Sequence, residues 1–177
     1  MNRHSSVRIL SIDVRRNRFG YVLFEGPERL LDWGASAVSP KLGRRAAVEA
    51  ALKRVAPLLR RCHPAAAVVK RPRRTKKGPS ATSGPMLGVV QGEAVKLNIP
   101  MYFVTWQEVL DAFRVFPAHN KDNIAETLAR IFPELIDKLP PRRGKWGTER
   151  PRMVIFDALA AGFTYWQRSG TQPPPPE

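Results

Sequence analysis

A carboxylate at the end of a buried strand is the first residue whose type and position could do chemistry. The run from Val7 to Ile12 is short and nearly continuous in apolar character, as is typical of a central strand buried on both faces, and Asp13 follows it. A carboxylate that leaves such a strand is costly to desolvate unless it meets a cation or hydrogen-bond donors. Asp13 therefore either binds something or faces solvent as an ordinary turn-forming residue.

Two basic segments are the second chemical feature. Six of the eight residues from 70 to 77 are basic and no acid interrupts them. Most such runs are solvated loops, and the breakers around this one predict a loop that cannot pack. The alternative is a pair of basic walls that hold phosphates, with Trp146 as a base-stacking platform. The candidate nucleic-acid contacts are Lys70, Arg71, Arg73, Arg74, Lys76 and Lys77 in the first wall, and Arg142, Arg143, Lys145, Trp146 and Arg152 in the second.

The composition of the whole chain favours a polyanionic partner. Its 177 residues hold 30 Lys and Arg against 15 Asp and Glu, a net charge of +15. Nucleic acid is the first candidate partner and an anionic membrane surface the second. No apolar run is long enough to span a bilayer and no signal-peptide cleavage site follows the N-terminus, so we expect a soluble, cytoplasmic, nucleoid-associated protein. Cys62 is the single cysteine, which excludes an internal disulfide, and its pairing with His63 is a weak metal signal.

The order of the predicted elements indicates one α/β domain. Residues 7 to 36 read as three strands joined by short turns, which predicts an antiparallel meander. Later strands alternate with helices, so we expect a five-stranded mixed sheet flanked by helices over residues 1–168. The Pro-rich tail, 169–177, has no apolar face to bury and is predicted to be disordered or polyproline II, open to a protein partner. The other predicted elements are helices at 43–62, 84–97, 105–113, 121–135 and 153–167, and strands at 65–69 and 100–104.

This element order resembles that of the ribonuclease H-like nucleases, and within them the RuvC-type Holliday-junction resolvases. The segment from Ile9 to Asp13, followed by Gly20 and Tyr21, is similar to the opening of that family, a hydrophobic strand that ends in Asp and then a Gly-aromatic pair. The segment from Phe156 to Ala160 is similar to its closing Asp-Ala-Leu-Ala helix motif, and Lys121 matches a lysine near the active site. The resemblance covers most of residues 7 to 168.

The resemblance implies a metal-dependent endonuclease that acts on branched DNA such as Holliday junctions, in DNA recombination and repair. In-line hydrolysis of a phosphodiester needs charge stabilisation at the attacking water and the leaving oxygen, which two Mg²⁺ ions held by carboxylates can supply. Hard oxygen ligands suit Mg²⁺ or Mn²⁺. On this reading Asp13 and Asp157 are metal ligands, and Lys121 contacts the phosphate or the transition state. A homodimer is also implied, because a four-way junction presents two symmetric strands.

Two positions depart from the resolvase pattern. Resolvases carry a Glu at the end of the fourth strand, where this chain has Lys70, and a metal-capable residue three positions before the helix Asp, where this chain has Val154. Glu149 is the predicted replacement ligand, because it lies just ahead of the last helix. Glu93, near the middle of a helix, is expected to face solvent instead.

The lysine leaves two further functions open. Its ammonium could occupy the place of one metal cation, or it could repel Mg²⁺ and leave a catalytically impaired protein that still binds nucleic acid. A basic subunit of a larger nucleoprotein assembly is the third possibility. Magnesium-dependent cleavage that Asp13→Asn abolishes would separate the nuclease from the other two.

Overall fold

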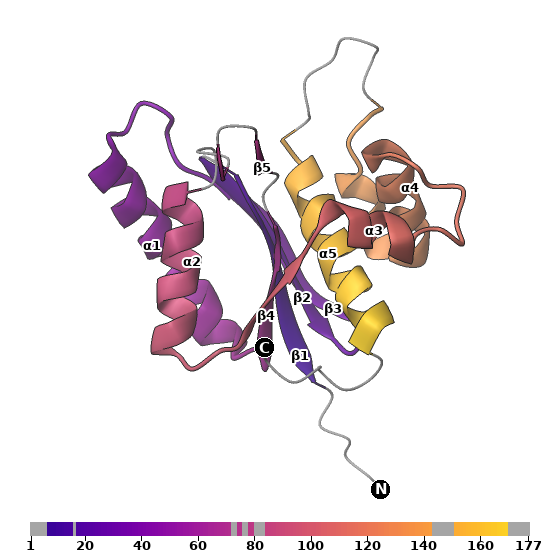
Figure 1. Cartoon of the computed structure of the whole chain (residues 1–177), viewed down its shortest axis with the longest axis horizontal. Helices are drawn as coiled ribbons and strands as arrows, with labels where there is room; N and C mark the ends of the chain where they lie inside the picture. The colour runs from indigo at the N-terminus through magenta and orange to yellow at the C-terminus, as the bar shows by residue number, and fades with distance from the viewer. Residues whose placement is uncertain are drawn as a thin grey trace, which may run out of the picture.

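The computed structural model of the chain describes residues 7–15, 17–71, 74–75, 78–79, 84–142 and 151–169. A twisted sheet runs through the centre with helices on both of its faces (Figure 1). The strand order is β3-β2-β1-β4-β7, so the first strand of the chain is the central strand. The predicted five-stranded mixed sheet is confirmed. The strands are β1 (Arg8–Val14), β2 (Arg18–Glu25), β3 (Leu30–Ala37), β4 (Ala66–Lys70) and β7 (Met101–Val104).

The N-terminal meander pairs as its short connections require. β1 and β2 are antiparallel with Asp13 opposite Gly20, and β2 and β3 are antiparallel with Tyr21 opposite Gly34. β1 then pairs with β4 in parallel, with Ile12 opposite Val69. The parallel pair needs a crossover connection, and a helix supplies it. All residues of β4 are buried, as expected of an apolar strand with neighbours on both sides.

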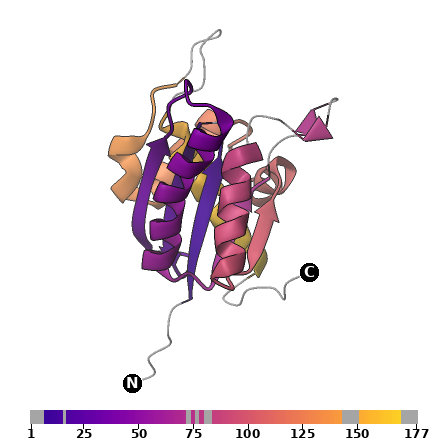
Figure 2. The same ribbon diagram turned by 90° about the vertical axis from the view of Figure 1, so that its left-hand side faces the viewer.

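One face of the sheet is covered by two helices that lie side by side, α1 (Arg44–Cys62) and α2 (Gly84–Lys96) (Figure 2). α1 continues as a single helix through Pro57, although a proline inside a helix removes one backbone hydrogen bond. Its buried side chains meet those of β1 and α2 in a core that includes Leu10, Val55 and Val90. This layer lies on the face of the sheet opposite the carboxylates described below.

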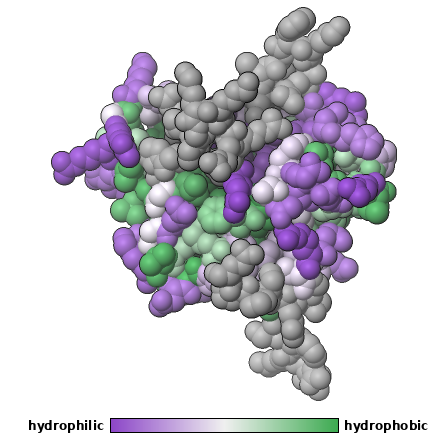
Figure 3. Space-filling view, viewed as in Figure 1, coloured by the Kyte–Doolittle hydropathy of each residue, from purple (hydrophilic) through white to green (hydrophobic). Residues whose placement is uncertain are grey.

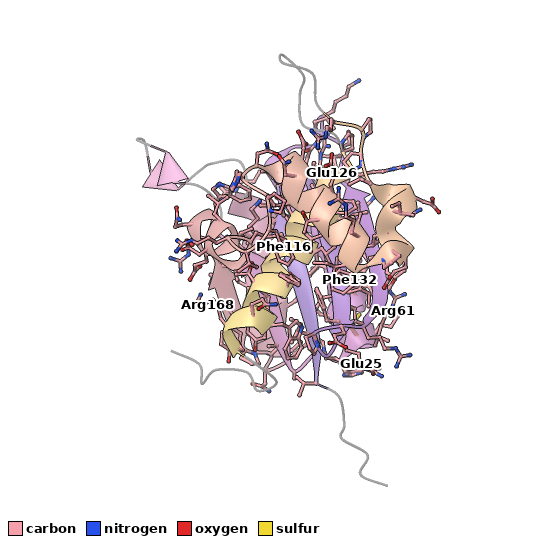
Figure 4. The ribbon with its side chains drawn as sticks, turned by 90° about the vertical axis from the view of Figure 1, so that its right-hand side faces the viewer. Glu25, Arg61, Phe116, Glu126, Phe132 and Arg168 are labelled. Atoms are coloured by element: carbon pink, nitrogen blue, oxygen red, sulfur yellow. The ribbon has the colours of Figure 1, made fainter. Side chains whose placement is uncertain are left out.

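The other face is covered by α5 (Met153–Ser169), which in turn lies beneath α3 (Trp106–Ala112) and α4 (Lys121–Ile131). A helix between a sheet and other helices has no side left for solvent, and α5 is buried from Met153 to Trp166. Figure 4 looks onto this layer, with Glu126 at one end of it and Arg168 at the other. Phe132, labelled in the same view, meets Phe24 of β2 edge to face, with ring centroids 6.0 Å apart.

Several predicted elements have other bounds or another form in the structure. The helix expected over 121–135 ends at Ile131, because Pro133 cannot continue it, and a 3-10 helix, η1 (Pro133–Lys138), follows. The basic segment, expected to be a plain loop, contains a small antiparallel hairpin of β5 (Arg74–Thr75) and β6 (Gly78–Pro79). The last helix continues two residues further than expected, to Ser169.

Hydrophilic residues predominate on both flanks of the molecule in Figure 3, and hydrophobic residues reach the surface in the middle of the view and in smaller patches on the flanks. Among the described residues, no helix has the length and apolar character needed to cross a membrane.

Candidate nucleic-acid site

The ends of the two central parallel strands bring the first two functional side chains together. Val69 lies opposite Ile12, so Asp13 and Lys70 are the next residues of neighbouring strands. The side chains of both reach the α5 face of the sheet, where each lies within the charge cluster described below. Figure 1 shows the start of α5 and β5 at the same end of the molecule as the end of β1.

Close packing against the sheet places the third residue, Asp157, in the first turns of α5. The Ser11 hydroxyl on β1 donates a hydrogen bond of 2.6 Å to the carbonyl of Ala158. Gly20 on β2 lies so near the helix that a Cβ there would be 2.2 Å from the carbonyl oxygen of Val154. The predicted pair of carboxylates, Asp13 and Asp157, therefore meets at one point, and each side chain is only 4% exposed.

Three cations surround these two carboxylates. The Lys70 ammonium contacts Oδ1 of Asp157, and the Lys121 ammonium lies 3.0 Å from Oδ2 of the same residue. Arg15 joins the two acids: its Nε donates to Asp13 Oδ2 at 2.7 Å, and its Nη2 donates to Asp157 Oδ2 at 2.5 Å. We call these five residues, Asp13, Arg15, Lys70, Lys121 and Asp157, the charge cluster.

The pKa values of the two carboxylates shift in opposite directions, because burial dominates at Asp13 and the neighbouring cations dominate at Asp157. Burial raises the pKa of Asp13, and the nearby Asp157 carboxylate raises it further, with Lys70 and Arg15 only partly opposing this. Burial would also raise the pKa of Asp157, but Lys70, Lys121 and Arg15 outweigh it and hold that pKa well below its usual range. Asp157 is therefore the firmly ionised member of the pair.

Lys121 lies at the N-terminus of a helix, which is an unfavourable position for a cation. It is the first residue of α4, after the cap in which the Asn120 side chain accepts a hydrogen bond from the Asn123 amide at 2.9 Å. A helix N-terminus carries a partial positive charge, so a lysine there gains nothing from its own helix. Its contact with Asp157 compensates for this, and its side chain remains 21% exposed.

Lys70 is the most buried of the three cations, with 10% of its side chain exposed. Its ammonium also lies over the ring of Trp106, 5.2 Å from the centroid. Such a cation-π contact attracts the ammonium to the face of the ring and helps to hold it there. The last residue of β4 is therefore a lysine that is held in place by an acid and an aromatic ring.

Sequence reasoning missed Arg15 and the role of Trp106. A signal for Arg15 existed, because residues two apart in a strand point to the same side, so a cation two positions after Asp13 can reach the same acid. Trp106 follows β7 by two residues, and the parallel pairing of Lys70 with Val104 brings it near. That pairing cannot be derived from local sequence.

The predicted basic walls are only partly within the described residues. Arg71 is exposed, with its guanidinium 5.5 Å from the centre of the Phe103 ring. Arg142 makes a two-point ion pair with Glu126, and Arg152 donates to the carbonyl of Asp137 at 3.3 Å. Only the backbone of Arg74 is described, in β5. The predicted residues Arg73, Lys76, Lys77, Arg143, Lys145, Trp146 and Glu149 lie outside the described residues.

Glu93 does not face solvent, contrary to expectation. It is 2% exposed, and its carboxylate lies 2.6 Å from the Lys96 ammonium and 3.5 Å from Nη2 of Arg60. It therefore joins α2 to α1 on the face of the sheet opposite the charge cluster. Val154, at the other position where a ligand was sought, is 3% exposed and part of the apolar packing.

The described residues do not fit a two-metal site. No group of three or more Asp, Glu, His or Cys side chains within the described part of the chain could hold an ion. Oxygens of both carboxylates that meet already accept from cations, and Mg²⁺ would need such oxygens as ligands. Magnesium and manganese thus stay predictions that depend on Glu149.

Comparison with known proteins finds similar structures but no similar sequence among protein families and curated proteins. No family model matches the sequence, and no curated protein matches it. The structure is similar to that of RuvC from T. thermophilus in complex with a Holliday junction substrate, with a TM-score of 0.71 and 22% identity over 96% of this chain and 99% of that one. It is also similar to the yeast mitochondrial Holliday junction resolvase Ydc2, with a TM-score of 0.58, 14% identity and coverage of 92% and 80%.

A viral enzyme extends this similarity. The Fowlpox virus resolvase, in complex with Holliday junction DNA, has a TM-score of 0.53 and 15% identity over 92% of this chain and 98% of that one. The three proteins come from a bacterium, a yeast and a virus, and each aligns with nearly the whole of this chain. The chain therefore has the RuvC-like fold of the Holliday junction resolvases.

Proposed function

We propose that this chain binds branched DNA, with the charge cluster and the basic residues around it as the binding face. The observation that carries the proposal is the meeting of Lys70, Lys121 and Arg15 at one partly open point, at the ends of β1 and β4. Cations in excess of acids attract phosphates, and the chain as a whole carries +15. Two of the similar structures contain Holliday junction DNA, which supports a branched rather than a linear ligand.

Recognition in this proposal depends on the shape of the DNA. Contacts from Lys and Arg to phosphates position a protein on nucleic acid but carry no base sequence information. The described cluster contains no Asn, Gln or other amide side chain of the kind that reads base edges. We therefore expect selectivity for junctions over duplex DNA and little preference among junction sequences.

Magnesium-dependent cleavage of the bound junction is the second candidate function. The observation that favours it is the meeting of Asp13 and Asp157, two carboxylates brought together from a central strand and a helix. Cleavage would require a further ligand such as Glu149 and displacement of the cations that now hold both acids. A homodimer, which would match the two symmetric strands of a junction, and a protein partner for the Pro-rich tail are part of this proposal.

The test measures binding and cleavage of labelled four-way junction, duplex and single-stranded DNA, with EDTA, Mg²⁺ or Mn²⁺. Preferred binding of the junction by about tenfold or more over duplex in EDTA is the expected result. Equal affinity for all three DNAs would overturn the proposal. Symmetric junction cuts with Mg²⁺ that are lost in Asp13→Asn would establish the second candidate.

A further inference from the structure

The arrangement around Asp157 shows what Lys70 does in place of the carboxylate that the resolvase pattern has at this position. Lys70 contacts Oδ1 of Asp157, while Arg15 and Lys121 contact Oδ2. Both oxygens of the one firmly ionised acid are therefore used by side-chain cations. Because a divalent ion would have to take the same oxygens, Lys70 and Mg²⁺ compete for one place.

The balance of charge points the same way. With both carboxylates ionised, the three cations and two acids of the charge cluster leave one positive charge in excess, and protonation of Asp13 would only increase it. A divalent ion would raise that excess to three in a buried place, where repulsion between like charges is strong. A phosphodiester, with one negative charge, would instead bring the cluster to neutrality.

The burial of the cations shows from which side an anion would come. Lys70 is almost closed off, with 10% of its side chain exposed, while Lys121 and Arg15 are 21% and 33% exposed. Lys70 can thus hold Asp157 from within, and the more open Lys121 and Arg15 can turn donors toward a phosphate. The Trp106 ring under the Lys70 ammonium keeps this lysine in place when the other two move.

We propose that Lys70 is a built-in replacement for a divalent metal ion, so that this site holds a backbone phosphate of DNA through Lys121 and Arg15 and excludes Mg²⁺ and Mn²⁺. The inference rests on the proposed binding of branched DNA and names the group that the site takes. It assigns to Lys70 a positioning role, since its ammonium acts through Asp157.

The first experiment contains no DNA, so that it is independent of the proposed function. Mn²⁺ is titrated into the full chain and the free ion is followed by electron paramagnetic resonance, for wild type, Lys70→Glu and Lys53→Glu. Lys53 is exposed on α1 and makes the same change in net charge away from the site. We expect wild type and Lys53→Glu to bind no Mn²⁺ at millimolar concentration, and Lys70→Glu to gain at least about tenfold in Mn²⁺ affinity.

Mn²⁺ binding by wild type that is lost in Asp157→Asn or Glu149→Gln would overturn the inference, because it would show a working metal site beside Lys70. Circular dichroism establishes that each variant is folded. Should Lys70→Glu fail to fold, Lys70→Met keeps the apolar stem, and the wild-type titration still decides whether the site excludes the ion.

The second experiment measures junction affinity with EDTA and with Mg²⁺. We expect equal wild-type affinity in the two buffers, a fall of about tenfold or more in Lys121→Gln, and no change in Lys53→Glu. Wild-type binding that requires Mg²⁺ would overturn the inference. If wild type binds neither Mn²⁺ nor any junction, the proposed function and the phosphate part of the inference fail together, while the exclusion of metal by Lys70 stands.

Discussion

At the scale of single residues, Asp157 is the centre of the charge cluster. It is the only one of the two carboxylates that contacts all three cations, and it is 4% exposed. A buried charge pair adds little net stability, but removal of one partner leaves the other charge buried and unpaired. The two partners differ in this respect, because Asp157 keeps Arg15 and Lys121 when Lys70 is removed, whereas Lys70 loses its ion-pair partner when Asp157 is neutralised.

Asp157→Asn should therefore destabilise the protein more than Lys70→Met. We expect the free energy of unfolding to fall by about 3 to 5 kcal/mol in Asp157→Asn, the range for an orphaned buried charge. Urea unfolding at neutral pH measures both variants. Asp111→Asn is the matched control, because Asp111 is 47% exposed in its pair with Arg114 and such surface pairs contribute about 0 to 1 kcal/mol. Equal losses in Asp157→Asn and the control would contradict the geometry.

Asp13 should behave in the opposite way, with a dependence on pH. Its pKa is raised in the folded protein by burial and by Asp157. The folded state therefore favours the protonated acid, and its contribution is present below the unfolded pKa, about 3.9, and is lost as the pH rises through the folded pKa. Asp13→Asn, which mimics the protonated form, should raise the urea midpoint at pH 7.

The gain should disappear below the unfolded pKa, where Asp13 is protonated in both states and the amide has no advantage. The comparison is one of urea midpoints at pH 7 and in acid, for Asp13→Asn and wild type. Asp157, whose folded pKa is lowered, stabilises above its unfolded pKa and loses this effect as the pH falls. A midpoint gain in Asp13→Asn that persists unchanged in acid would show that the effect comes from packing.

At the scale of elements, the position of α5 on the sheet decides whether the charge cluster exists. Two contacts fix it: the hydrogen bond from Ser11 to Ala158, and the close approach of Gly20 to Val154. Asp157 lies three residues after Val154, so a shift of this turn moves its carboxylate away from Lys70. Glycine is needed at position 20 because the helix backbone occupies the place of a side chain.

Gly20→Ala should lower both the stability of the protein and its affinity for junctions. The added Cβ would be 2.2 Å from the Val154 carbonyl oxygen, which belongs to backbone and cannot rotate away. We expect a loss of about 1 to 3 kcal/mol in the free energy of unfolding, as for other overpacked sites, together with weaker junction binding. Thermal and urea unfolding measure the first, and fluorescence anisotropy measures the second.

Gly88→Ala is the control for this substitution. Gly88 is exposed in α2, with nothing within 4 Å of an added Cβ. Alanine there should stabilise the protein by roughly 0.5 to 1 kcal/mol, because glycine is a poor helix former. Gly20→Ala as stable as Gly88→Ala would mean that α5 does not approach β2 as described.

Local patterns predicted the elements well and the contacts of the site only in part. Apolar runs, helical periodicity and turn residues predicted the strands and helices, because these signals are local. They also gave Asp13, Lys121 and Asp157 through their resemblance to resolvase motifs. Arg15 was missed although Asp13, two residues before it, was a local signal. Trp106 was missed and Glu93 was expected to face solvent, because Lys70 and Arg60, which they contact, belong to elements distant in the chain.

At the scale of the whole molecule, the distribution of basic residues sets how binding depends on salt. Each phosphate that a Lys or Arg neutralises releases counterions, so log affinity falls linearly with log salt by about 0.9 for each contact on duplex DNA. Not all basic residues count, since several are paired on the surface with acids, such as Arg142 with Glu126 and Arg8 with Glu25. The salt slope therefore reports the binding face and not the net charge of +15.

Arg71 and Arg54 give a test of how near the DNA lies to the ends of β1 and β4. Arg71 is exposed and directly follows Lys70 at the end of β4, while Arg54 lies on α1, where it donates to the carbonyl of Ala50. We expect a steep negative slope for junction binding by wild type, reduced by about 1 in Arg71→Ala and unchanged in Arg54→Ala. Anisotropy titrations at several salt concentrations in EDTA give all three slopes. A reduction in Arg54→Ala with none in Arg71→Ala would place the DNA over α1, where Phe19, Tyr21, Arg54 and Arg61 line a pocket, and the charge cluster would then be a structural feature of the core.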